Sequence, residues 1–233
     1  MKYKSFLGVV DRIEEKLAVN GWKTVDRTSG LLVLRALDTA NAIRHEIIFG
    51  HPFKYIDLSG GPWIGISCDT QILFEKLEAT IAEKLNRNQA SNVSAIFGLA
   101  LMAPEPLFYA KNVFPINTSS ADSMKEGVDH LLSIYSKFVE PQRKALTTAS
   151  CFDDPGYYPH DSVSPLTWEL RRAARYSMTK TSEEYNVYIN GLMVRINDYV
   201  NGLGNDQSIA ADAARRTISE IRQFVENSKT EVR

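Results

Sequence analysis

The sequence has few of the residues that most often carry covalent or metal chemistry. Its 233 residues include only two cysteines and four histidines. Cys68 and Cys151 are too few for a disulfide scaffold and lack the paired spacing of zinc ligands, so we expect free thiols in a reducing compartment. No nucleophile elbow, zinc-protease helix, Walker loop or dinucleotide-binding glycine motif is present. These absences exclude the reaction classes that depend on a recognisable local motif.

Long apolar runs and an excess of one charge are also lacking. The longest apolar run, residues 95–104, falls short of the roughly 20 residues that cross a bilayer. Charges from Asp11 onward interrupt any signal-peptide core. The 27 basic and 28 acidic side chains give a net charge of −1, which creates no long-range field for nucleic acid or anionic lipid. We therefore expect a cytoplasmic protein that binds neither membranes nor nucleic acid.

Apolar residues make up 44% of the chain and recur with clear periods. Phe6, Val9, Ile13 and Leu17 have helical spacing, and Gly21 follows as a stop signal. From Leu31 the pattern changes to short runs rich in β-branched and aromatic residues, which predict an antiparallel sheet. These runs are LLVLRAL, RHEIIFG, FKYIDLS and PWIGISC.

The middle of the chain gives mixed signals. The joint SGGP at 59–62 predicts a hairpin turn between the last two of these strands. Asp69 or Thr70 is expected to cap an amphipathic helix that runs to about residue 85. Residues 93–116 leave two alternatives open: an edge strand near the end, and a buried strand or helix near the start.

Helical periodicity dominates the rest of the sequence. A helix after residue 120 is expected to end at Glu140–Pro141, because proline removes a donor and restricts the residue before it. Three further helices are predicted, at about 166–178, 185–203 and 210–225. Strands first and helices afterwards predict an α+β fold: an N-terminal helix, an antiparallel sheet of about four to five strands with packed helices, and a C-terminal helical region. We expect a sheet domain at 1–150 and a helical region at 151–233, packed together as one compact unit.

The stretch CFDDPGYYPHDSVSP at 151–165 concentrates polar groups and aromatic rings. Asp-Asp-Pro-Gly is turn chemistry, and a following serine can cap the next helix. Bulky aromatic residues on a restrained backbone among acids are common in interface hot spots. The sequence therefore predicts a partner-binding surface here, made of Phe152, Asp153, Asp154, Tyr157, Tyr158 and Asp161.

Histidine and arginine offer weaker candidates. His160 and the neighbouring carboxylates could instead hold a divalent cation in a metal-dependent hydrolase. His45 and His51 share strand parity, but without a third ligand they are expected to be core or edge residues. Arg171, Arg172 and Arg175 lie in the first turns of a predicted helix, where they could form an anion site, and Arg171 and Arg175 share one face. Because glutamates lie nearby, we expect a solvated, salt-bridged face instead.

The order of the segments resembles a family. The helix ending in NGWKTVDR, the strands above and the later FPINTSSADSMKEGVDHLLSIYSKFVEP look like uncharacterised bacterial α+β domains often found as immunity proteins. The resemblance covers roughly residues 4–147 and lies in the layout rather than in a diagnostic motif. It implies a cytosolic protein that binds a cognate toxin and blocks it without catalysis.

Three functional hypotheses follow. The first is a non-catalytic binding protein, without cofactor or metal, that neutralises a toxin or effector by occlusion. The second is the metal-dependent hydrolase centred on His160. The third is a self-associating module, a homodimer, which rests on the apolar helical tail.

Overall fold

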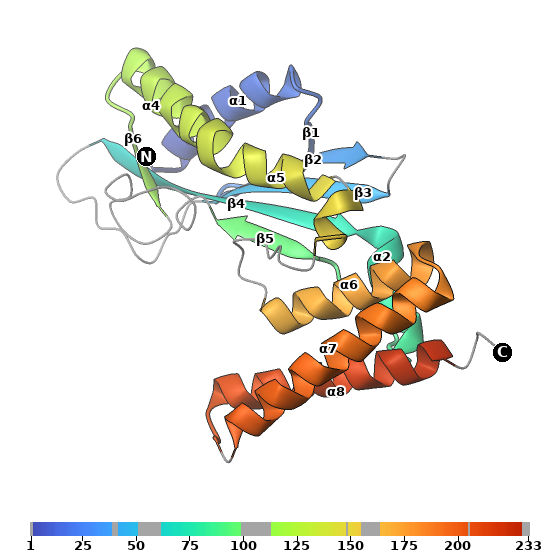
Figure 1. The fold of residues 1–233 in the computed structure, drawn as a ribbon. Coiled ribbons are helices and arrows are strands. Elements are labelled where there is room, and N and C mark those ends of the chain that lie inside the picture. Colours follow the sequence, from blue (N-terminus) through green and yellow to red (C-terminus); the bar gives the residue numbers. More distant parts are fainter. Residues whose placement is uncertain are drawn as a thin grey trace. The chain divides into compact units, whose positions relative to one another are not determined.

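A computed structural model describes residues 2–38, 42–50, 62–98, 113–147, 149–154, 164–204 and 206–229. The chain forms two compact units. Unit 1 contains the described residues of Met1–Leu73 and Ala95–Thr148. Unit 2 contains the described residues of Phe74–Ser94 and those from Ala149 onward, which include the last three helices. The second unit thus takes in a piece of chain that precedes residue 100. Figure 1 shows the elements of both units.

Unit 1 is built on an antiparallel sheet. The strands β1 (Lys23–Arg27), β2 (Leu31–Asp38), β3 (Ile43–Gly50), β4 (Trp63–Phe74) and β5 (Ala95–Gly98) lie in this order. A sixth strand, β6 (Phe114–Asn117), pairs with the first residues of β4, whereas β5 pairs with residues 69–72 of β4. The α+β fold and its antiparallel sheet are as the sequence predicts.

Helices cover one face of the sheet. These are α1 (Lys2–Ala18), α4 (Ala121–Ile134) and α5 (Glu140–Thr147), which Figure 1 shows on the same side of the strands. Alternate residues of β3 point into this layer, so Ile47 and Phe49 are fully buried. The apolar stripe predicted for the first helix packs here as well, with Phe6 and Ile13 fully buried.

Two local predictions need correction or sharpening. Asp69 and Thr70 do not cap a helix, because β4 continues through them to Phe74 and Thr70 is fully buried. The helix α2 (Glu75–Lys84) starts only after the strand, without a side-chain cap. Residues 95–98 and 114–117 are strands, which resolves the start and the end of the ambiguous segment. The FKYIDLS strand and residues 59–61 of the SGGP turn lie outside the described residues.

Pro141 does not end the helix that precedes it. A π-helical turn, η1 (Tyr135–Val139), joins α4 to α5, and the Glu140 amide donates to the Tyr135 carbonyl five residues earlier. An α-helix would bring the proline ring against a carbonyl four residues back. The wider π-turn changes this register just before Pro141, so the chain continues as a helix to Thr147.

Unit 2 is helical. It combines α2 with α6 (Pro165–Thr179), α7 (Ser182–Leu203) and α8 (Ile209–Lys229), close to the ranges predicted for the last three helices. Thr181 and Glu184 form a capping box at the start of α7. A short 3₁₀ turn, η2 (Ala149–Phe152), also belongs to this unit. No helix in the described ranges is long and apolar enough to span a membrane.

Candidate functional site

Residues 151–154, the start of the stretch that the sequence singles out, are fastened to α6 by one side chain. We call them the acidic segment. Arg172 is fully buried, and its guanidinium donates from Nε to the Phe152 carbonyl (3.2 Å) and from Nη2 to the Asp154 carbonyl (2.9 Å). Two fixed carbonyls, two residues apart, determine the path of the backbone between them. The acidic segment is therefore held in one conformation on the helix.

The charge of Arg172 is balanced inside unit 2. Its Nη1 lies 3.0 Å from Glu169 Oε1, and Glu169 also accepts a hydrogen bond from the Tyr188 hydroxyl. Glu169 is 4% exposed, so this is an ion pair removed from water. Burial, followed by the neighbouring Glu169 carboxylate, raises the pKa of the Tyr188 phenol. The guanidinium thus has both a counter-charge and neutral acceptors.

An aromatic contact fixes the side chain of Phe152. Its ring stacks on Trp168 of α6 with centroids 4.8 Å apart, and it meets Phe74 edge-on at 5.1 Å. Phe152 is 3% exposed. The expectation that Phe152 belongs to an exposed binding surface is therefore corrected: it is an anchor of the segment, because an aromatic ring between two others is removed from solvent.

Asp153 and Asp154 are the exposed side chains of the acidic segment. The Asp153 carboxylate lies 3.1 Å from Lys180 Nζ and raises the pKa of that lysine. The Asp153 carbonyl accepts from the Tyr176 hydroxyl at 3.5 Å. Tyr157, Tyr158 and Asp161, the other residues predicted for this surface, lie outside the described residues, and their role stays a prediction. The structure thus brings two of the predicted carboxylates to the surface on a fixed backbone.

The thiol at the start of the segment is not suited to nucleophilic chemistry. Cys151 is 6% exposed, and burial raises its pKa to about 12, although Arg172 and Arg175 act in the opposite direction. The reactive form of cysteine is the thiolate. His160, the centre of the metal hypothesis, lies outside the described residues, so that hypothesis stays untested. Within the described ranges, no three histidine, cysteine or acidic side chains are grouped as metal ligands.

A second buried ion pair lies on the same helix. Arg171 Nε is 2.6 Å from Glu78 Oε1 of α2, and the Ser94 hydroxyl donates to the same carboxylate at 2.7 Å. Arg171 is 6% exposed and Glu78 is 3% exposed. The expected solvated, salt-bridged face of this helix is therefore wrong for Arg171 and Arg172. Both cations point into unit 2 and are neutralised there by glutamates.

One sequence signal for these buried arginines exists. The run WELRRAA places apolar residues on every side of the helix, which is typical of a buried helix rather than a surface one. Charges in such a run need buried partners. Glu169 is close enough in sequence to be proposed as one partner, but Glu78 is 93 residues away from Arg171.

A third polar cluster lies in unit 1, between the sheet and the helices. His45 is 3% exposed on the inward face of β3, as expected for a core residue, and its Nδ1 has no hydrogen-bond partner. Burial, followed by the nearby Arg143 of α5, lowers the pKa of His45 to about 4. Arg143 itself pairs with Glu140 and lies over the ring of Trp22. His51 lies outside the described residues.

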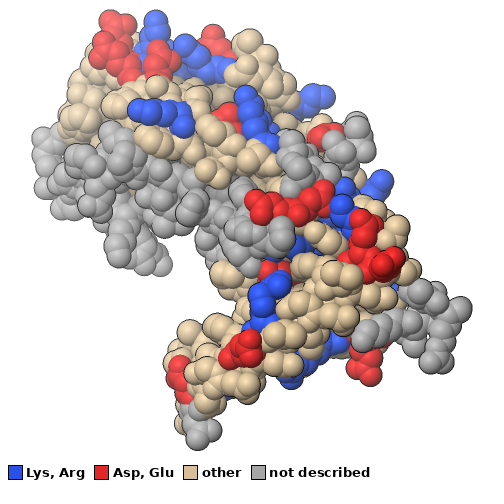
Figure 2. All heavy atoms as spheres, in the orientation of Figure 1, with Lys and Arg blue, Asp and Glu red and all other residues tan. Residues whose placement is uncertain are grey.

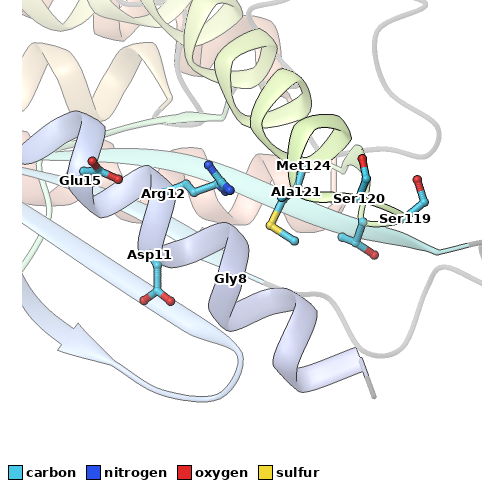
Figure 3. A pocket seen from close by; sticks show the side chains of 9 residues that line it. Gly8, Asp11, Arg12, Glu15, Ser119, Ser120, Ala121 and Met124 are labelled. Carbon is cyan, nitrogen blue, oxygen red and sulfur yellow. The ribbon is translucent and has the colours of Figure 1, made fainter.

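A hollow also lies on the surface of unit 1. It has a volume of about 600 Å³ and lies in unit 1 between α1 and the start of α4. In Figure 3, Arg12 extends from α1 toward Met124, whereas Asp11 points away from α4. Asp11 and Glu15 add negative charge to the same lining, so the hollow shows no preference for a ligand of one sign. Charges of both signs also alternate on the face shown in Figure 2.

Comparisons with protein-family models, with curated proteins and with solved structures find no match to the chain.

Proposed function

We propose that this chain is a non-catalytic binding protein that uses the acidic segment to hold a partner protein. The layout resemblance favours a bacterial immunity protein, whose partner is a cognate toxin or effector neutralised by occlusion. The observation that supports a binding role best is the fixation of this segment by Arg172, which holds the carbonyls on both sides of Asp153. A surface that is ordered before binding loses less conformational entropy when the complex forms.

The chemistry of the segment suits recognition better than catalysis. Its exposed groups are carboxylates, while its thiol is buried and protonated. Carboxylates on a rigid backbone attract and orient a basic surface on a partner, and they raise the association rate at low ionic strength. The partner is therefore expected to present lysine or arginine side chains to Asp153 and Asp154.

The test uses the product of the neighbouring reading frame in the source genome. Its affinity for the full chain is measured by calorimetry, and its toxicity is measured by growth on co-expression. Asp153→Asn with Asp154→Asn is expected to lower the association rate and to reduce its salt dependence. Asp198→Asn with Glu226→Gln, which removes two exposed charges from α7 and α8, is the matched control and leaves binding unchanged. Replacing Tyr157 and Tyr158 by alanine is expected to weaken binding by about 1 to 4 kcal/mol if either is an anchor.

Two outcomes contradict the proposal. One is a neighbouring product that neither binds the chain nor is neutralised by it. The other is a complex whose affinity and salt dependence are the same for the wild type and for the double aspartate variant. In the second case the chain is a binding protein, but it binds through a different surface.

A further inference from the structure

The residue that ends α6 is a cation that contacts the acidic segment. The ammonium of Lys180 lies 3.1 Å from Asp153 Oδ1 and 5.6 Å from the centre of the Tyr176 ring. The Tyr176 hydroxyl donates to the Asp153 carbonyl at 3.5 Å. The Asp153 carboxylate and the Tyr176 ring therefore bind the same ammonium group, and we call these two groups the cation site.

The cation site is fixed by contacts that do not involve Lys180. Arg172 holds the backbone on both sides of Asp153. The ring of Tyr176 stacks on Tyr188 of α7, with centroids 4.4 Å apart, and the Tyr188 hydroxyl donates to the buried Glu169 carboxylate at 2.5 Å. Both groups of the site are thus anchored to the interior of unit 2. A preformed site loses less conformational entropy when a ligand binds.

The cation that occupies this site is held only at the surface. The side chain of Lys180 is 28% exposed and that of Asp153 is 43% exposed. Ion pairs between exposed, flexible side chains contribute little to stability, because water competes for both charges. A lysine side chain also gains rotamer freedom when it is released. Another cation can therefore take the place of Lys180.

The surroundings of the site favour a cation. Asp153 and, more weakly, Glu184 of α7 raise the pKa of Lys180. The site lies at the C-terminal end of α6, where the helix dipole is negative, and the last turn of this helix contains no basic residue. A guanidinium suits the two groups better than an ammonium. It is planar, so it can donate two hydrogen bonds to one carboxylate and also stack on an aromatic ring.

We propose that Asp153 and Tyr176 form a binding site for an arginine side chain of the partner, and that Lys180 occupies this site in the free protein as an internal competitor. The inference rests on the proposed function, in which the acidic segment binds a basic surface. In the complex the guanidinium pairs with the Asp153 carboxylate over the Tyr176 ring, and Lys180 Nζ moves into water. The competitor weakens the binding of isolated cations, so a true partner must supply further contacts.

Tetra-arginine and tetra-lysine peptides test the cation site on the full chain. Their dissociation constants are measured by NMR titration, with the amide signals of Asp153 and Tyr176 as reporters. Lys180→Met is expected to bind tetra-arginine about two- to fivefold more tightly than the wild type, because an exposed ion pair no longer competes. Arg175→Met is the matched control. It removes the same charge from the same helix, leaves Lys180 on Asp153 and keeps the wild-type affinity.

The competitor and the site are separated by a double variant. Adding Asp153→Asn to Lys180→Met should abolish the gain in affinity, because the carboxylate that the guanidinium needs is gone. The inference is overturned if Lys180→Met gains no more affinity than Arg175→Met, if the gain persists in the double variant, or if the reporter signals do not shift at saturation. Equal affinities of Lys180→Met for tetra-arginine and tetra-lysine would also overturn the preference for arginine.

The product of the neighbouring reading frame distinguishes this inference from the proposed function. If that product does not bind, the proposed function fails, and the peptide titrations still decide whether the cation site exists. If its association depends on the acidic segment, but Lys180→Met binds it no more tightly than the wild type, the proposed function stands and the role of Lys180 as a competitor is refuted.

Discussion

Arg172 and Glu169 lie one turn apart on α6 with Nη1 and Oε1 3.0 Å from each other, and neither side chain is more than 5% exposed. The neighbouring Arg171 is neutralised by Glu78 in the same way. Two cations and two anions are therefore buried in unit 2, and Glu169 has a second, longer ion pair with Arg195 at 3.6 Å. Substitution of one charged residue at a time therefore measures its contribution to the free energy of unfolding.

Replacing Arg172 by methionine is expected to destabilise the protein by up to about 3 to 5 kcal/mol, because it removes the buried cation of the pair and leaves the Glu169 carboxylate with the longer, half-exposed ion pair to Arg195 at 3.6 Å. It also removes the donors to the Phe152 and Asp154 carbonyls. Urea denaturation followed by circular dichroism gives the free energy of unfolding. Arg215→Met, which breaks the exposed pair with Asp212, is the control and should cost less than about 1 kcal/mol. Similar losses for both variants would show that Arg172 is not buried as described.

The pair between Glu78 and Arg171 is expected to be strongly coupled. A double-mutant cycle with Glu78→Gln and Arg171→Met should give an interaction free energy of about 1 to 3 kcal/mol, because the two groups share one buried hydrogen-bond network with Ser94. The exposed pair of Arg87 and Glu220 serves as the reference cycle. A coupling near zero for the buried pair would mean that water screens it.

Two helical glycines are predicted to respond in opposite directions to alanine. A Cβ at Gly127 of α4 would lie 2.9 Å from Ile116 Cγ2 of β6, which is too close, whereas a Cβ at Gly191 of α7 meets only Arg195 Nη1 at 3.6 Å. Gly127→Ala should therefore lower the melting temperature. Gly191→Ala should raise stability by about 0.5 to 1 kcal/mol, because alanine has the higher helix propensity. Thermal unfolding of both variants measures this contrast, and a gain in stability at Gly127 would contradict the packing of α4 on β6.

The free energy of unfolding of the protein should depend on pH through the protonation of His45. Its pKa is about 4 in the folded state and 6.5 in an exposed chain, so the unfolded chain takes up the proton first. The contribution of the neutral, buried histidine to the free energy of unfolding is fully present above about pH 6.5. It decreases as the pH falls toward 4, by about 3 kcal/mol in total. Unfolding of the wild type and His45→Phe is compared at pH 7.5 and 4.5. The comparison is needed because the raised pKa of Asp69 acts in the opposite direction, favouring the folded state as the pH falls. Parallel curves for the two proteins would exclude His45 as the source.

The two thiols are expected to be unreactive in the folded protein. Burial raises the pKa of both Cys68 and Cys151, so neither is a thiolate at pH 8. A thiol reagent should label neither within minutes in buffer and both in urea. A Val19→Cys variant supplies an exposed thiol as the positive control, since Val19 is 86% exposed. Rapid labelling of Cys151 in the folded state would show that the acidic segment opens readily.

Local periodicity predicted the fold well because the buried faces are regular. The buried residues of β3 alternate strictly with less buried ones, and the buried stripe of α1 has helical spacing throughout. The buried face of each element can therefore be predicted from its own sequence. The end of β4 was predicted wrongly because Asp69 and Thr70 have the side chains of helix caps, yet pairing with β5 keeps them in the sheet. The exposed strand β1 has no apolar alternation and was not predicted.

The candidate site was predicted only in part. The acidic segment was identified from its composition, but the clamp that holds it was not, because Arg172 reads in sequence as one more charge on a helix with glutamates nearby. Its acceptors are backbone carbonyls, which carry no sequence signal at all. The coupling of Arg171 to Glu78 depends on tertiary contact between segments far apart in the chain.

The way the second unit is assembled limits how this protein can be dissected. A fragment beginning at residue 149 would contain α6, α7 and α8 but not α2, which lies at Glu75–Lys84. In this fragment Arg171 would be buried without Glu78, its counter-ion, which lies on α2. Excision at a single point should therefore yield an aggregating or molten fragment, and a faithful minimal domain would require residues 74–94 to be supplied as well, in trans or through an engineered connection.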